Sequence, residues 1–206
     1  MKNILRDPEF WAILGFNLFL FYAYLTDITG FDTLIVLFYL QNIFIGIQYW
    51  IRMFSAGMRL TDNLIIPSLR LPMFFFVHYG MFHVVYAVFL FTIVMDIPGA
   101  LDFDIIYAMI GVMVINTIMS TVSDIRRDRE DEGNMAFMFF TPYLRVVPMH
   151  LFIMLAFNNS IGTQENKMTN ALILFVGLKM LSDLIMHIVI NKTWKDRRPP
   201  VLVDGI

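Results

Sequence analysis

The stretch PMFFFVHYGMFHVVYAVFLFTIVM, residues 72–95, decides the class of fold. It holds no Asp, Glu, Lys or Arg. As a helix rising about 1.5 Å per residue, it is long enough to cross a hydrocarbon layer of about 30 Å. His78 and His83 interrupt it, and a polar side chain inside such a segment needs a partner or a function. The stretch therefore predicts a transmembrane helix with a polar feature in its interior.

The composition extends this prediction to the whole chain. Of the 206 residues, 58% are hydrophobic and only 16% are charged, whereas soluble domains carry about 25% charged residues. We expect one all-α domain, residues 1–206, built as a polytopic membrane bundle in contact with the lipid bilayer. The net charge of −2 gives no electrostatic support for binding nucleic acid. The absence of cysteine excludes thiolate metal ligands.

Six stretches are apolar over a length that can cross a bilayer. The predicted transmembrane helices cover residues 10–25, 31–53, 72–95, 105–125, 142–157 and 170–190. Pro8, Pro72 and Pro142 lie at or just before three of these starts, where proline's missing N–H costs nothing.

The basic residues indicate an orientation. Every Lys and Arg except Lys167 and Lys179 lies on one set of connections or at the adjoining helix ends. The positive-inside rule then places both termini in the cytoplasm and the protein in the cytoplasmic membrane. We expect the charged run DIRRDREDEGN, residues 124–134, to be a solvated helix end and loop. The sequence leaves open whether the chain forms a homo-oligomer.

Strongly polar side chains recur within the predicted spans, where they usually face the bundle interior. Counting from the predicted cytoplasmic helix ends places most of them at similar depths, in the cytoplasmic half. The sequence thus predicts one polar site built by four helices. Its candidate residues are Gln41, Asn42, Gln48, Arg52, His78, His83, His150, Lys179, Asp183 and His187.

The helical spacing relates several of these residues. Lys179, Asp183 and His187 follow at i, i+4 and i+8 and form one stripe, in which Asp183 can pair with Lys179, with His187 or with neither. His78 and His83 lie about 140° apart on an ideal helix. A π-bulge would bring these two histidines together; otherwise one faces the site and the other packs elsewhere.

Four segments together resemble a bacterial and archaeal family of integral-membrane proteins known only as a domain of unknown function. The resemblance implies a small helical membrane bundle and no established activity. At the positions of Gln41, Gln48 and Tyr86 the family pattern often has Glu, Asn and His. The segments are YLQNIFIGIQYWIRM (39–53), FFFVHYGMFHVVYAVFL (74–90), YLRVVPMHLFIM (143–154) and GLKMLSDLIMHIVI (177–190).

The leading hypothesis from these residues is a metal site, with zinc as the metal to test. His78, His150, Asp183 and His187 supply imidazole and carboxylate ligands from three helices. The supporting residues are Lys179, Gln41, Asn42, Gln48, Arg52 and His83.

Three alternatives stay open. Two histidines on different helices could ligate a b-type haem. The stripe at Lys179, Asp183 and His187 is typical of small transporters and proton-coupled membrane proteins. The polar residues, including Asn17 and Asn116, could instead join helices in a structural subunit of a membrane complex. No catalytic motif is present, so the sequence leaves open whether the chain is an enzyme.

Overall fold

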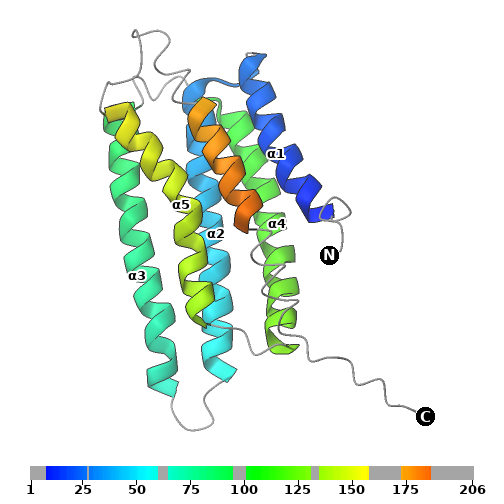
Figure 1. Cartoon of the computed structure of the whole chain (residues 1–206), viewed down its shortest axis with the longest axis vertical. Coiled ribbons are helices and arrows are strands. Elements are labelled where there is room, and N and C mark those ends of the chain that lie inside the picture. Colours follow the sequence, from blue (N-terminus) through cyan, green and yellow to red (C-terminus); the bar gives the residue numbers. More distant parts are fainter. Residues whose placement is uncertain are drawn as a thin grey trace, which may run out of the picture.

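Six helices form the part of the chain that the structure, a computed structural model, describes (Figure 1). The described residues are 8–26, 28–59, 65–94, 101–130, 135–157 and 173–186. The helices are α1 (Pro8–Leu25), α2 (Phe31–Arg59), α3 (Ile65–Phe89), α4 (Phe103–Glu130), α5 (Met135–Phe157) and an orange helix over residues 173–186. A π-helical turn, η2 (Leu90–Val94), continues α3. The prediction of an all-α fold is confirmed.

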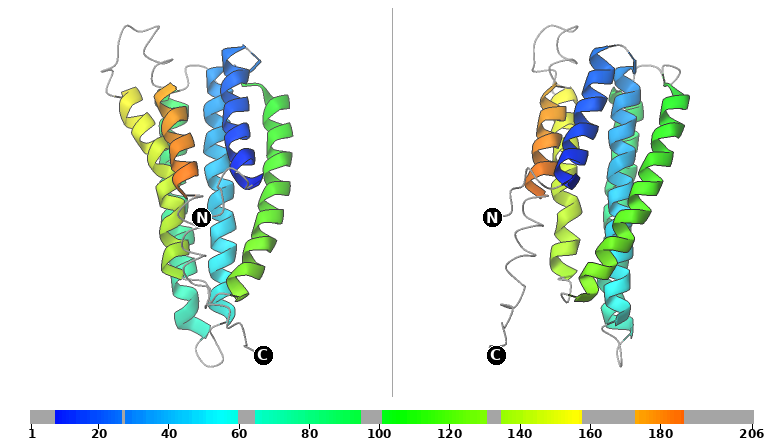
Figure 2. Two further views of the ribbon diagram at one scale, coloured as in Figure 1. Left: turned by 45° about the vertical axis from the view of Figure 1, so that its right-hand side comes forward. Right: turned by 90° about the vertical axis from the view of Figure 1, so that its right-hand side faces the viewer.

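The helix α2 lies at the centre of the bundle. It contacts α1, α3, α4 and α5, and residues 34–38 are buried on every side, as expected of a helix that is apolar all round. The helix α4 covers one side of α2, and α1 and the helix over residues 173–186 cover the other (Figure 2, right). Successive helices run in alternating directions (Figure 1).

Three of the helices are long and apolar enough to cross a membrane. The segments are Phe31–Met58, Leu69–Thr92 and Phe103–Asp128. They correspond to the second, third and fourth of the six predicted spans.

The predicted starts of two helices are wrong. Pro72 lies inside α3 and Pro142 inside α5, so both helices begin earlier than the prolines suggested, and only Pro8 starts its helix. An internal proline removes one helical hydrogen bond. Membrane bundles tolerate this loss because neighbouring groups satisfy the freed carbonyl.

Pro148 on α5 shows how the loss is compensated. Proline has no N–H to donate to the carbonyl four residues earlier, and that carbonyl belongs to Leu144. The hydroxyl of Ser182, on the helix over residues 173–186, donates to the Leu144 oxygen at 3.0 Å. A backbone acceptor freed by sequence thus becomes a link between two helices.

The contact of α2 with α3 depends on a glycine. The ring of Tyr79 lies directly against Gly46, where a Cβ atom would collide with it. This close approach lets the Tyr79 hydroxyl donate to the Asn42 carbonyl at 3.0 Å. The ring also stacks on Phe75 of the same helix at a centroid distance of 4.9 Å. The contact of Tyr79 with Gly46 and Asn42 therefore anchors α3 to α2.

The start of α4 is fixed by a cap. The Asp102 carboxylate accepts the N–H of Ile105 at 3.1 Å, which satisfies an unpaired donor of the first turn. The Asp102 N–H in turn donates to the Thr33 hydroxyl at 2.9 Å. These two bonds set the height of α4 relative to α2.

We predict that Ser182→Ala lowers the free energy of unfolding by about 1 kcal/mol, because the Leu144 carbonyl loses its partner. In a Pro148→Ala background the same change should cost much less, since alanine has the backbone N–H that proline lacks and restores the helical donor. A double-mutant cycle on the detergent-purified protein, followed by thermal unfolding, measures the difference. Equal costs in the two backgrounds would contradict this role of Ser182.

Candidate functional site

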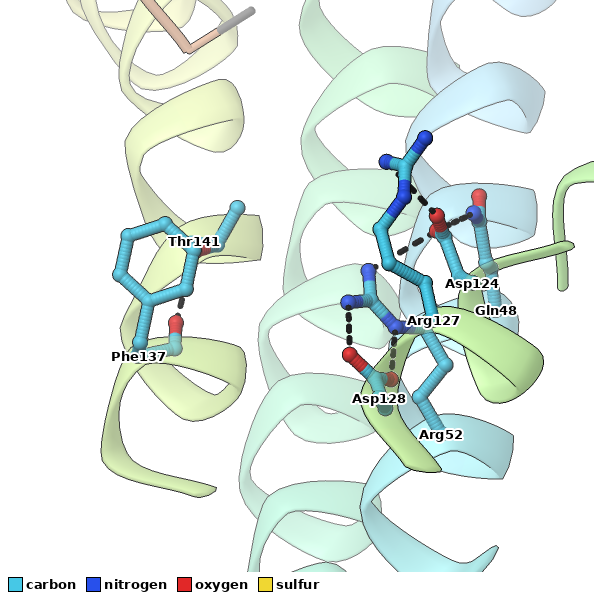
Figure 3. A network of polar contacts seen from close by, with 7 residues as sticks. All are labelled: Gln48, Arg52, Asp124, Arg127, Asp128, Phe137 and Thr141. Carbon is cyan, nitrogen blue, oxygen red and sulfur yellow. Dashed lines mark hydrogen bonds and ion pairs between the residues drawn. The ribbon is translucent and has the colours of Figure 1, made fainter. Parts of the chain in front are cut away.

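A network of charged side chains joins α2 to α4 (Figure 3). The Arg52 guanidinium binds both oxygens of Asp128, with Nε–Oδ2 at 2.9 Å and Nη2–Oδ1 at 3.1 Å. Its Nη1 lies 3.0 Å from Asp124 Oδ2, which also accepts Gln48 Nε2 at 3.0 Å. The Arg52 and Asp128 side chains are almost fully buried. Bidentate geometry of this kind makes the strongest ion pairs.

The charges of this α2–α4 network balance. Arg52 and Arg127 supply two positive charges, and Asp124 and Asp128 supply two negative charges. Arg127 lies at the rim, 3.8 Å from Asp124. Because the buried Arg52 donors are paired with carboxylates, the network is best suited to fixing α4 against α2.

This network corrects the interpretation of residues 124–134. The helix α4 continues to Glu130, and Asp128 is buried rather than solvated. Asp124 and Asp128 were not among the predicted site residues. Their i, i+4 spacing matches that of Gln48 and Arg52 on the neighbouring helix, and this match was the available signal.

A second cluster lies between α1, α5 and the helix over residues 173–186. Lys179 Nζ binds Asp183 Oδ2 at 3.0 Å, and the Asn17 amide approaches the same oxygen at 3.4 Å. Lys179 is 2% exposed and Asp183 4%. The Lys179 ammonium also lies 5.3 Å from the centre of the Phe38 ring, a cation–π arrangement. Of the pairings that the sequence left open for Asp183, the structure shows the one with Lys179.

Arg145 brings a second cation to this interior cluster. Its Nε lies 3.9 Å from Asp183 Oδ1, too far for a hydrogen bond. Within the described part of the chain, this buried Nε has no hydrogen-bond partner. With Pro142 as the predicted helix start, Arg145 would lie at a positively charged helix end; α5 in fact begins at Met135, which places Arg145 well inside the helix.

The interior cluster therefore differs from the α2–α4 network in its charge balance. Among the described residues, Lys179 and Arg145 face a single carboxylate, that of Asp183. An ammonium group carries three donors, and Asp183 meets only part of this demand. Among the described residues, the interior cluster therefore has two cations and one carboxylate, an excess of positive charge inside the bundle.

The polar residues do not share one layer as predicted. Lys179 lies over Phe38, whereas Arg52 is about 21 Å further along the α2 axis at the usual helical rise. Gln48 and Arg52 belong to the α2–α4 network. Asn42, which meets Tyr79, lies at the level of the interior cluster. Gln41 is half-buried on α2, and the structure gives its amide oxygen no partner among the described residues.

The histidines of α3 and α5 form two separate pairs with tyrosines. His78 Nδ1 lies 2.7 Å from the Tyr143 hydroxyl, and His150 Nδ1 lies 3.3 Å from the Tyr86 hydroxyl. Both pairs connect α3 to α5, at two successive positions along these helices. His78 and Tyr86 are about 12 Å apart along the α3 axis, so His78 and His150 lie at different heights.

His83 points to another neighbour. Its Nδ1 lies 3.0 Å from the Tyr79 carbonyl, so Nδ1 carries the proton. Its own carbonyl accepts the Tyr39 hydroxyl of α2 at 2.9 Å. The helix is regular between His78 and His83, and the π-helical turn follows at Leu90–Val94. No bulge joins the two histidines, and each packs against a different helix.

The metal hypothesis gains no support from this geometry. Among the described residues, no three His, Asp or Glu side chains come together as metal ligands. His78 and His150 bind different tyrosines, and Asp183 binds Lys179. His187, the fourth proposed ligand, lies outside the described residues.

The geometry also gives no support to the hypothesis of a b-type haem. The His78 ring stacks on Phe74 at 5.2 Å and meets Phe82 edge-on at 5.0 Å. The His83 ring lies 4.4 Å from that of Tyr79. A b-type haem held by two histidines also needs both imidazoles on one iron, whereas His78 and His150 lie at different heights and bind different tyrosines.

The class of protein is now defined: an all-α bundle with three helices long and apolar enough to cross a membrane, and with buried charges between its helices. The chain belongs to the family of unknown function DUF6498, which matches residues 2–200. This family, like the one that the motifs resemble, is a domain of unknown function. Comparison with curated proteins and with solved structures gives no match.

We predict that His78→Ala and His150→Ala act independently on stability, because each histidine has its own tyrosine partner. The two free-energy changes should add within about 0.5 kcal/mol in the double variant. His78→Ala and Tyr143→Phe, in contrast, should show a coupling energy, since they share one hydrogen bond. Thermal unfolding of the purified variants measures both cycles. Strong coupling between positions 78 and 150, with loss of a bound metal, would contradict the two-pair arrangement.

Proposed function

We propose that the chain is a multi-pass protein of the cytoplasmic membrane with both termini in the cytoplasm. Three helices of sufficient length and apolarity support this placement. Large apolar side chains are exposed along α3 and α4, among them Val77, Val84 and Met119, and exposed apolar surface suits contact with lipid. The distribution of Lys and Arg supports the orientation.

We further propose that the interior cluster binds a small anionic solute, as the site of a small transporter does. One observation carries the proposal: the buried Lys179 and the partly buried Arg145 share only one described carboxylate, and the buried Arg145 Nε donates no hydrogen bond there. An unbalanced buried charge is costly. An anion that accepts hydrogen bonds from Arg145 and Lys179 would remove that cost.

The place of the cluster in the bundle supports transport. Asp183 and Asn17 join the helix over residues 173–186 to α1, and Lys179 faces Phe38 of the central helix. Phe38 lies about 10 Å along α2 from the Phe31 end of the segment Phe31–Met58, so the cluster is inside the segment and about a quarter of the way along it. Charged residues inside a membrane commonly mark a solute path.

The proposal can be tested with simple anions. Sodium phosphate, sulfate or acetate is added to the detergent-purified protein, with sodium gluconate at matched ionic strength as the reference. We expect at least one anion to raise the thermal unfolding midpoint; an anion at 100 times its Kd adds about 2.7 kcal/mol to stability. Lys179→Met and Arg145→Met should each abolish the gain, because each leaves one cation balanced by Asp183.

Arg127→Gln is the matched control, since it removes a cation that lies at the rim of the other network. This variant should keep the anion-dependent gain. Equal gains in the wild type, Lys179→Met and Arg127→Gln would show that the anions act through ionic strength, and would contradict the proposed site.

A further inference from the structure

The helix α4 has an open side. It packs against α2, and the rest of its surface faces outward at the edge of the bundle (Figure 2, right). Exposed side chains follow this outer surface, including Val112, Ile115 and Met119. Such a surface meets either lipid or another protein.

Asn116 distinguishes these two possibilities. It is exposed on α4, at the centre of the apolar segment Phe103–Asp128, and the structure shows no hydrogen bond from its side chain to any described residue. In a membrane this carboxamide would sit in the middle of the hydrocarbon layer, where unpaired polar groups are expensive. The interhelical hydrogen bond expected for Asn116 is therefore missing within the described part of one chain.

We propose that a second copy of the chain packs against this surface and pairs its own Asn116 with that of the first. Two copies inserted in the same orientation are related by a twofold axis along the membrane normal, which makes their α4 helices parallel and aligned in depth. Asn116 then lies opposite Asn116. A carboxamide has both donors and an acceptor, so two of them satisfy each other without a different partner.

The spacing of exposed residues supports a helix pair. Positions 112, 116, 119 and 123 are all exposed and follow steps of four, three and four residues, as in packed parallel helices. Ser123 at one end of this stripe and the exposed Ala108, one turn before Val112, are small, which permits close approach. Asn116 lies inside the stripe.

Introduced cysteines test the proposal, because the chain has none of its own. Single variants Val112→Cys, Asn116→Cys and Met119→Cys are made on the stripe. Tyr107→Cys and Ile118→Cys, also exposed but on another side of α4, are matched controls. Membranes are treated with copper phenanthroline, and dimers are read on a non-reducing gel. We expect dimers from the stripe variants and little from the controls, because a disulfide needs Cα atoms within about 7 Å.

A second measurement tests the contribution of the Asn116 side-chain amide to self-association. Asn116→Leu should weaken self-association about tenfold in a fluorescence energy-transfer titration of labelled protein in detergent, while Ile118→Leu should leave it unchanged. Crosslinking that is equal on both sides of α4, or absent from the stripe, would overturn the dimer. The dimer rests on the proposed membrane placement and does not depend on the anion site. Recovery of the protein outside the membrane fraction would overturn both the dimer and the membrane placement. The anion experiments test the anion site independently of the dimer.

Discussion

A charged side chain inside an apolar bundle must meet an opposite charge, and this constraint governs how the helices are joined. The central helix α2 brings Arg52 to the side covered by α4, where Asp124 and Asp128 neutralise it. On the opposite side, Lys179 and Asp183 form a pair that also involves Asn17 of α1. Each side of α2 therefore has its own buried ion pair.

The two clusters differ in how completely their buried charges are paired. We assign a structural role to the fully paired cluster and a functional role to the incompletely paired one. The α2–α4 network pairs the Arg52 donors with carboxylates in close geometry, which leaves it no evident need for a further partner. The interior cluster sets Lys179 and Arg145 against Asp183 alone among the described residues. Functional sites commonly keep such incompletely satisfied groups, because a ligand can complete them.

The sequence predicted features that depend on one segment of the chain. It did not predict contacts between side chains from distant segments. The apolar lengths of residues 31–53, 72–95 and 105–125 are local patterns, and they predicted three helices that are long and apolar enough to cross a membrane. The i, i+4 spacing of Lys179 and Asp183 allowed the ion pair that the structure shows. The partner of Gln48 lies 76 residues away on α4, and no local pattern in 124–134 distinguished a buried Asp128 from a solvated one. Pro142 was taken as a helix start because the sequence alone does not show that neighbouring groups can satisfy freed carbonyls, as Ser182 does for Leu144.

The central claim, an excess of positive charge in the interior cluster, is tested most directly by comparing the stability of Lys179→Met with that of Asp183→Asn in gluconate buffer. The account predicts a strong asymmetry. Lys179→Met leaves Arg145 facing Asp183 and should change the free energy of unfolding little, whereas Asp183→Asn leaves two buried cations and should cost about 3–5 kcal/mol. Equal costs, or a larger cost for Lys179→Met, would show that the cluster carries no excess charge and would contradict the proposed anion site.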